Sequence, residues 1–308
     1  MSNYNVTGRP LNDSIIAMDI DEPRGDSFAY SVLSRPAGMP EYQALAITGT
    51  HLSSGSSRLY VVNLKPALDD ETGEVLDPNV HGANSTIEVL TLETGSSSLK
   101  HERTYYDPLI STPNNLAVNP DGSFYVVNDR GLHRTGLMAQ IPPPFAHGTV
   151  VYCPAYGACK TVASGLRFPN GPVRKDDRLI VPSTIVGVIY VFDILADGNL
   201  ERVQTVRHDY PTDNLSIDRN GDIFAPGFPK GLEMLELVSA KDLWSVKMPK
   251  GVVWRLRESA DGKSWERVKV LEDAESRVLP APTTVVHDAL TGRLFLSGKS
   301  DECCTLLC

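Results

Sequence analysis

Three short segments of the chain place a side-chain amide directly before an apolar run. They read Pro113-Asn114-Asn115-Leu116, Phe168-Pro169-Asn170-Gly171 and Thr212-Asp213-Asn214-Leu215. Amide carbonyls and a carboxylate are hard oxygen ligands, which suit calcium with its roughly six to eight oxygens and suit zinc or copper poorly. If the segments converge, their Asn carbonyl oxygens and the one Asp carboxylate would hold a calcium ion. The alternative is that these side chains only cap turns, as Asn and Asp commonly do.

A repeated unit sets where these segments lie. Each copy has a short apolar strand, a turn with Asp, Asn or Gly, and a second apolar strand, which together predict a hairpin. Behind four of the five copies comes a second strand pair, and four strands per unit are typical of a propeller blade. The copies begin near His51, Thr112, Asn170, Asp213 and Thr283.

Two further runs precede the first copy, 14–20 and 42–47, and we expect them to form the outer half of another blade. The last copy adds only one strand, 304–307, to its hairpin. The sequence therefore predicts an all-β fold, a six-bladed β-propeller in which residues 1–308 form a single domain and the first blade lacks its inner hairpin. The start of each inner strand would face the central channel, where a ligand or ion can bind.

Composition and charge exclude several classes of protein. The 308 residues carry a formal net charge of −9, which opposes binding to a phosphate backbone, so we expect no nucleic-acid partner. No apolar run reaches the roughly 18 to 20 residues of a membrane-spanning helix, so we expect no integral membrane segment. The first residues lack the basic start and apolar core of a secretory signal, so the chain is either cytoplasmic or secreted with its leader removed.

The cysteines have no spacing typical of a zinc site. We expect one disulfide at most and favour buried free thiols, as in a reducing compartment. The five cysteines are Cys153, Cys159, Cys303, Cys304 and Cys308.

The channel segments resemble those of the paraoxonase/arylesterase family of six-bladed propellers, relatives of the gluconolactonases and strictosidine synthases. The likeness runs from about Ser14 to the end of the chain. It is most specific in Pro113-Asn-Asn-Leu-Ala-Val, Phe168-Pro-Asn-Gly and Asp213-Asn-Leu-Ser-Ile-Asp. The resemblance implies a catalytic calcium in the channel and, by residue-by-residue matching, four candidate ligands among those that hold it: Asn114, Asn170, Asp213 and Asn214.

The chain also departs from the family pattern. The family's Glu-Asp pair on the first inner hairpin is absent, and Asn115 stands where an acidic residue helps to hold a second calcium, so we expect that second ion to be lost or weak. Leu64, Arg130 and Phe228 occupy positions where the resemblance implies histidines. His51 is a loose match for the first member of a histidine dyad, or else a surface histidine.

The resemblance implies a calcium-dependent hydrolase of lactones or aryl esters, in which the ion polarises the carbonyl of a small-molecule substrate. Asp213 would be both a ligand and a candidate base, and His51 is the alternative base if it faces the channel. One rival hypothesis is a propeller-fold biosynthetic enzyme, a cyclase, condensing or pericyclic enzyme, that acts on a natural-product intermediate without hydrolysis. Another is a non-catalytic binding propeller. The substrate's identity and the oligomeric state stay open.

Overall fold

The computed structural model describes most of the chain, and the described part is almost entirely β-strand. The described residues are 13–24, 27–39, 43–53, 55–81, 83–131, 147–208, 210–230, 233, 248–278, 281–298 and 305–307. Within them the single helix with assigned bounds, α1 (Pro78–His81), is one turn long. The expected all-β class is confirmed.

The described strands form six antiparallel sheets, and within each sheet the strands pair in chain order. The first contains β1 (Ile16–Arg24) and β2 (Ser27–Val32). The second contains β3 (Ala44–His51), β4 (Ser56–Pro66), β5 (Ala83–Glu93) and β6 (Leu99–Tyr105). The third contains β7 (Pro113–Val118), β8 (Phe124–Asn128), β9 (His147–Cys153) and β10 (Lys160–Arg167).

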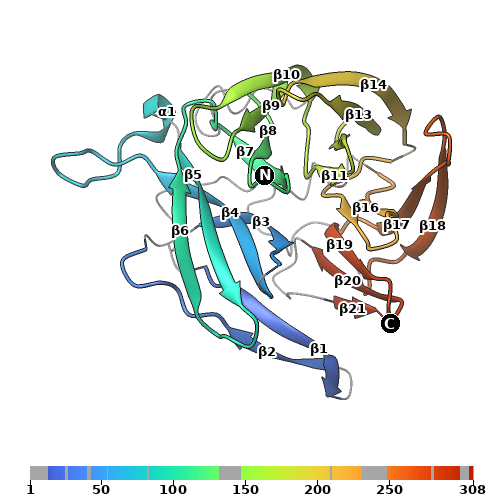
Figure 1. Ribbon diagram of the computed structural model, residues 1–308. Helices are drawn as coiled ribbons and strands as arrows, with labels where there is room; N and C mark the ends of the chain where they lie inside the picture. The colour runs from blue at the N-terminus through green and yellow to red at the C-terminus, as the bar shows by residue number, and fades with distance from the viewer. Residues whose placement is uncertain are drawn as a thin grey trace.

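The remaining sheets follow the same plan. The fourth contains β11 (Val173–Lys175), β12 (Arg178–Ser183), β13 (Val188–Ile194) and β14 (Leu200–Arg207). The fifth contains β15 (Ser216–Ile217), β16 (Ile223–Gly227), β17 (Gly251–Glu258) and β18 (Trp265–Asp273). The sixth contains β19 (Pro282–Asp288), β20 (Arg293–Gly298) and β21 (Thr305–Leu307). Figure 1 shows the sheets following one another around the middle of the molecule.

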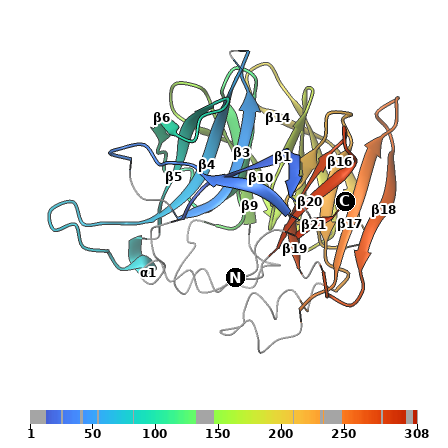
Figure 2. The same cartoon turned by 90° about the horizontal axis from the view of Figure 1, so that it is seen from below.

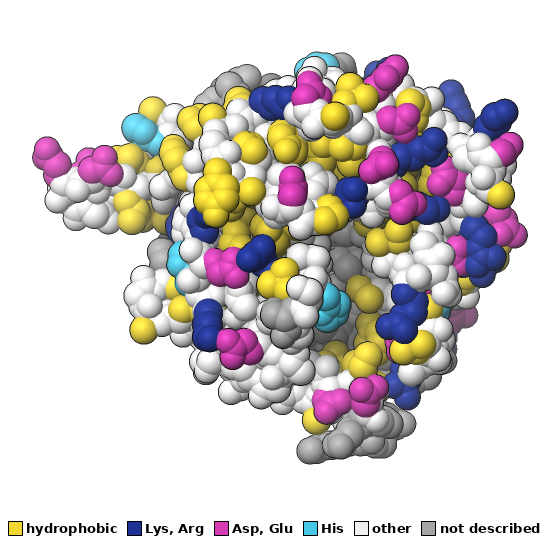
Figure 3. All heavy atoms as spheres, viewed as in Figure 1, with side chains coloured by type: hydrophobic (Ala, Val, Ile, Leu, Met, Phe, Trp, Pro, Cys, Tyr) yellow, Lys and Arg dark blue, Asp and Glu magenta, His cyan; other side chains and the backbone are white. Residues whose placement is uncertain are grey.

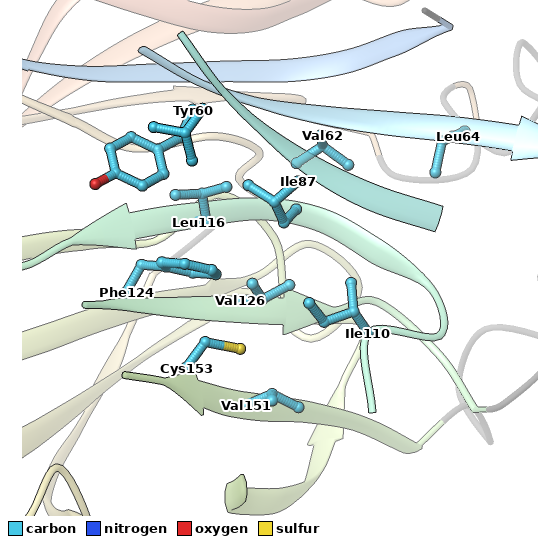
Figure 4. Close-up of a cluster of buried hydrophobic side chains, with 11 residues drawn as sticks. Tyr60, Val62, Leu64, Ile87, Ile110, Leu116, Phe124, Val126, Val151 and Cys153 are labelled. Atoms are coloured by element: carbon cyan, nitrogen blue, oxygen red, sulfur yellow. The ribbon is translucent and has the colours of Figure 1, made fainter. Parts of the chain in front are cut away.

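The buried core lies between neighbouring sheets. β8 is buried at every position because it is covered on both faces. Its alternate side chains point in opposite directions, so Phe124 and Val126 pack with the second sheet, whereas Tyr125 and Val127 pack with the fourth. Figure 4 shows the first of these clusters, in which the rings of Tyr60 and Phe124 lie 5.7 Å apart. Burial on both faces explains why this inner strand is apolar at consecutive positions.

The first sheet lies between the second and the sixth in both views (Figure 1 and Figure 2). Leu33, just after β2, is buried in one cluster with Val61 of β4. On the other side, Phe28 of β2 packs against Phe295 of β20 with ring centroids 6.0 Å apart. Arg293 Nη1 also donates a hydrogen bond to the carbonyl oxygen of Ile20 at 2.7 Å. The two-stranded sheet therefore contacts both of its neighbours.

The strand pairing at the start of the chain corrects the expected blade. The run 42–47 does not pair with 14–20, because β3 pairs with β4 in a register that sets Ala44 opposite Asn63 and His51 opposite Ser57. β1 pairs instead with β2, a strand that the sequence pattern did not reveal. The short turn after His51 has Gly55 at φ 77° and makes β3 and β4 antiparallel neighbours. His51 therefore ends an inner strand and does not begin one.

A disulfide joins Cys153 to Cys159, so the favoured reading of free thiols is wrong for this pair. The hairpin of β9 and β10 sets Lys160 opposite Tyr152, which brings the two cysteines side by side with their Cα atoms 4.3 Å apart. Cys303, Cys304 and Cys308 lie outside the described residues, as do most of the two long segments 128–148 and 228–250. In the part of the chain that the structure describes, no helix is long and apolar enough to cross a membrane.

Candidate metal and active site

The three amide-bearing segments lie at the starts of neighbouring inner strands. Asn114 and Asn115 begin β7, Asn170 precedes β11, and Asn214 precedes β15. A parallel bridge joins Asn214 to Thr284, and the amide nitrogen of Leu215 donates to the carbonyl oxygen of Gly171 at 3.0 Å. The segments from the third, fourth, fifth and sixth sheets therefore meet at one opening, which we call the amide opening.

Asn214 is the most constrained side chain of the amide opening. Its Nδ2 donates to the carbonyl oxygen of Thr283 at 2.9 Å, and it also faces Thr284 Oγ1 at 3.4 Å and Asp213 Oδ1 at 3.2 Å. Because these acceptors take the nitrogen, the amide oxygen is turned the other way, where it accepts a hydrogen bond from Asn115 Nδ2 at 3.1 Å. The surroundings therefore fix which end of the Asn214 amide presents an oxygen.

Gly171 separates the two amides, and the sequence analysis assigned it no role. A Cβ atom on Gly171 would lie 2.8 Å from Asn214 Cβ and 2.9 Å from Asn115 Nδ2, and closer still to the oxygen of Asn214. Real Cβ atoms essentially never approach heavy atoms this closely. Only glycine lets the backbone pass here. No local signal distinguishes this glycine, because the atoms that crowd it come from two other sheets.

The other candidate ligands lie beside this contact. Asn170 is buried; its Oδ1 accepts from the amide nitrogen of Gly171 at 2.9 Å and its Nδ2 donates to Thr184 Oγ1 at 3.0 Å. Asn114 lies at a break in the pairing of β7 with β8, where the register shifts between Pro113 and Asn115. Such a bulge redirects a side chain away from the alternation of the strand. Asp213 is 8% exposed and supplies the carboxylate next to Asn214.

His51 is not brought to the amide opening. It ends β3 and is exposed, and its Nδ1 lies 3.1 Å from Ser57 Oγ. Together with Val118 and Asn119 at the far end of β7, it lines a cavity at the opposite ends of the inner strands. At about 3.3 Å per residue, the length of β3 separates His51 from the start of its strand by roughly 23 Å. The expectation that His51 serves as a channel-facing base therefore does not fit this geometry.

Other side chains occupy the three positions where the resemblance implies histidines. Leu64 is 3% exposed within a core cluster, and Phe228 is fully buried. Arg130 pairs with the neighbouring Asp129, with Nε 3.0 Å from Oδ1, and its guanidinium lies 5.4 Å from the ring centroid of Phe168. Phe168 has φ 47°, an uncommon conformation for a residue with a side chain, three positions before Gly171.

A buried polar network supports the start of β3. The amide nitrogen of the buried Gln43 donates to Asn63 Oδ1 at 2.9 Å, and Asn63 Nδ2 lies 3.4 Å from Glu88 Oε1. Burial alone would raise the pKa of Glu88, but hydrogen bonds from Lys65 Nζ at 2.8 Å and Thr104 Oγ1 at 2.6 Å lower it to about 2. A charged carboxylate thus anchors this end of the second sheet. Neither Gln43 nor Glu88 is expected at this place from the sequence pattern.

The donor chemistry of the amide opening fits a hard cation in part. Oxygen ligands are present, and Asp213 brings a negative charge; the other candidate ligands are neutral amides. Within the described residues, no group of three or more His, Cys, Asp or Glu could hold a metal ion. Any ion bound at this opening would therefore depend on amide oxygens such as that of Asn214.

The fold and the amide opening together define an all-β protein of antiparallel sheets whose inner strands begin around a set of oxygen-bearing side chains. A family model described as Arylesterase matches residues 39–278. The chain therefore belongs to the arylesterase family, which confirms the resemblance seen in its motifs.

Curated relatives agree with this assignment. The chain is 31% identical over 170 residues to serum paraoxonase/arylesterase 2 of Gallus gallus, which covers 54% of this chain and 48% of that protein. It is 26% identical over 266 residues to serum paraoxonase/lactonase 3 of Mus musculus, which covers 83% of this chain and 71% of that protein. The chain thus spans about half the length of the chicken relative in their match.

Solved structures that the chain matches at low sequence identity include the following two. A putative 6-phosphogluconolactonase from Bacteroides uniformis matches with a TM-score of 0.49 and 11% identity, covering 95% of this chain and 91% of that chain. The periplasmic gluconolactonase of Pseudomonas aeruginosa matches with a TM-score of 0.40 and 18% identity, covering 72% of this chain and 63% of that chain.

Proposed function

We propose that this chain is a calcium-dependent hydrolase of lactones or aryl esters that acts at the amide opening. Family membership supports the class of reaction, and the relatives named above carry arylesterase and lactonase in their names. The observation that carries the proposal is the amide of Asn214, whose nitrogen is held by Thr283 so that its oxygen faces the other amide segments.

The proposed architecture is a six-bladed propeller in one domain over residues 1–308, with β1 and β2 as an incomplete first blade. Six described sheets, each in contact with its neighbours around the middle of the molecule, support this arrangement. In this arrangement the inner strands run parallel to one another, so they begin at the amide opening and end at the opposite side of the molecule. The parallel bridge between Asn214 and Thr284 supports this arrangement.

Calcium would be held by oxygens of the candidate ligands, which are Asn114, Asn170, Asp213 and Asn214. When bound, the ion supplies a Lewis acid that polarises the substrate carbonyl. Asn115 donates to Asn214 and so holds that amide in place. Gly171 leaves room for the two side chains to approach each other.

Asp213 is the candidate general base because it is a buried carboxylate at this opening. In this role it would accept a proton from the water that attacks the ester or lactone carbonyl, and the carboxylic acid formed would then return the proton to the leaving oxygen. Asn214 Nδ2, which faces Asp213 Oδ1 at 3.2 Å, orients the carboxylate.

The test compares Asn214→Ala with Asn199→Ala, a change in an exposed turn between β13 and β14. Calcium content is measured by plasma mass spectrometry, and hydrolysis of phenyl acetate and of a δ-lactone is measured with and without excess chelator. We expect Asn214→Ala to lose both calcium and turnover, and Asn199→Ala to retain both. Full hydrolysis by metal-free protein in excess chelator would overturn the proposal.

The second candidate is a biosynthetic enzyme that binds a natural-product intermediate and performs no hydrolysis. It is favoured by the three positions where the resemblance implies histidines, because none of them offers an imidazole for hydrolysis. Leu64 and Phe228 are packed in the core, and Arg130 is paired with Asp129. A panel of lactones and aryl esters separates the candidates. Chelator-sensitive turnover supports the hydrolase, whereas calcium binding without turnover of any substrate supports the biosynthetic enzyme.

A further inference from the structure

A cavity of about 270 Å³ lies at the end of the inner strands opposite to the amide opening. Thr50 and His51 at the end of β3 line it, together with Asn119 just after β7. Arg58 of β4 and Arg174 of β11 complete the polar part of its wall. Figure 3 shows a hollow near the middle of one face of the molecule, with side chains of both charges and a His side chain around it.

The two arginines reach the cavity from different sheets. Arg58 belongs to the second sheet and Arg174 to the fourth, and the turn of the third sheet lies between them. Gly122, in that turn, has φ 85°, and a Cβ atom there would lie 3.8 Å from Arg58 Nη1. The guanidinium of Arg58 therefore lies beside this turn. Two guanidinium groups on either side of one turn can hold an anion between them.

The carboxylates near Arg58 and Arg174 leave some of the N–H donors of the two guanidinium groups unused. Arg58 uses its Nε edge on Glu102, with the two atoms 2.8 Å apart. Arg174 Nη2 lies 3.6 Å from Asp177 Oδ1, but the side chain of Asp177 is 95% exposed, where water screens the charge. Asp121 accepts hydrogen bonds from the hydroxyl and the amide nitrogen of Ser123, at 2.6 and 3.0 Å.

The cavity wall also contains buried polar atoms that lack hydrogen-bond partners in the described structure. Arg174 Nε is one of them, and the amide oxygen of Asn119 is another. A buried donor without a partner carries a free-energy cost, and this cost is larger for a charged group. A ligand that accepts hydrogen bonds from Arg174 would remove that cost.

We propose that this cavity binds a small anionic molecule through a carboxylate or phosphate group placed between Arg58 and Arg174. Both guanidinium groups present planar donors that match the oxygens of either anion. The cavity, about 270 Å³, lies just below the roughly 300 Å³ at which small-molecule sites begin, so it has room only for a compact anion. His51 and Thr50 would contact the rest of the molecule.

This site is independent of the proposed hydrolase site. Val118, which lines the cavity, and Asn114 at the amide opening lie at opposite ends of β7. Four residues of strand separate them by roughly 13 Å. The anion would therefore occupy a place that the ester or lactone does not need.

The test is calorimetric titration of the full chain with inorganic phosphate and, separately, with succinate at constant ionic strength. We expect saturable binding of at least one of these anions to the unaltered protein, and the one that binds identifies the preferred group. Arg174→Gln should weaken that binding at least tenfold. The control Arg207→Gln removes one positive charge from an exposed position of β14 and should leave binding unchanged.

Arg58→Gln serves as a second variant, and thermal melting verifies that each variant is folded. Loss of binding in a folded Arg58→Gln variant gives the same support as loss in Arg174→Gln. The proposal is overturned if neither anion binds saturably. It is also overturned if both arginine variants bind as tightly as the unaltered protein.

Discussion

The close approach at Gly171 yields the sharpest prediction, because its magnitude follows from distances. In Gly171→Ala the new methyl would lie 2.8 Å from Asn214 Cβ and 2.9 Å from Asn115 Nδ2. Asn214 cannot turn aside without breaking its hydrogen bond to Thr283 as well as the one from Asn115. Overpacking costs about 1 to 3 kcal/mol, and each lost hydrogen bond about 1 kcal/mol.

We therefore expect Gly171→Ala to lower the free energy of unfolding by about 3 to 5 kcal/mol, measured by urea denaturation at neutral pH. The matched control is Gly131→Ala, because a Cβ atom at Gly131 would have no heavy atom of the described residues within 4 Å. The control should be as stable as the unaltered protein, or slightly more stable, because Ala reduces the entropy of the unfolded chain. If Gly171→Ala unfolds within about 0.5 kcal/mol of the unaltered protein, the packing at the amide opening is not as described.

Three further predictions concern polar and covalent contacts. Asn115→Ala removes the donor to Asn214, so stability should fall by about 1 kcal/mol while calcium content, measured by mass spectrometry, stays unchanged, because the hydrogen bond to Thr283 still fixes the orientation of the Asn214 amide. The pKa of Glu88 is about 2 against an ordinary 4.5, which contributes about 3 kcal/mol to the free energy of unfolding. This contribution is present above pH 4.5 and is lost as the pH falls towards 2. In Glu88→Gln the pH dependence of urea unfolding over that range should therefore flatten. Replacing both Cys153 and Cys159 by Ala opens the loop, and the melting temperature should fall by an amount that corresponds to about 2 kcal/mol; a melting curve insensitive to this change would contradict a stabilising disulfide.

The fold class could be predicted because turn residues and apolar runs are local features. The copies of the repeat that begin near Thr112, Asp213 and Thr283 have Asp, Asn or Gly between two apolar runs, and each contains two paired strands, β7 with β8, β15 with β16, and β19 with β20. The strand pairing at the start of the chain was predicted wrongly, because local features do not show which strands pair. The run at 42–47 reads as a strand in either sheet, and only pairing with β4 decides to which sheet it belongs.

The amide segments show how far local reasoning reached at the candidate site. Their residue types pointed to a hard cation and to the start of inner strands, and the structure indeed places Asn115 next to Asn214 across two sheets. His51 was expected to begin an inner strand, but it lies at the end of β3, because the hairpin that follows it pairs β3 with β4. The family resemblance could not show at which end of β3 His51 lies, because it compares residue types along the chain and carries no information on strand pairing.

The sequence by itself determined the strand-rich class, the family and the residue types at the amide opening. These follow from turn chemistry and from the alternation of side chains, which act over a few residues. The tertiary structure alone decided that Gly171 must lack a side chain, which way the amide of Asn214 is turned, and that Arg58 and Arg174 share one cavity. Each of these depends on atoms from different sheets, far apart along the chain, that approach within a few ångströms only when the sheets are packed together.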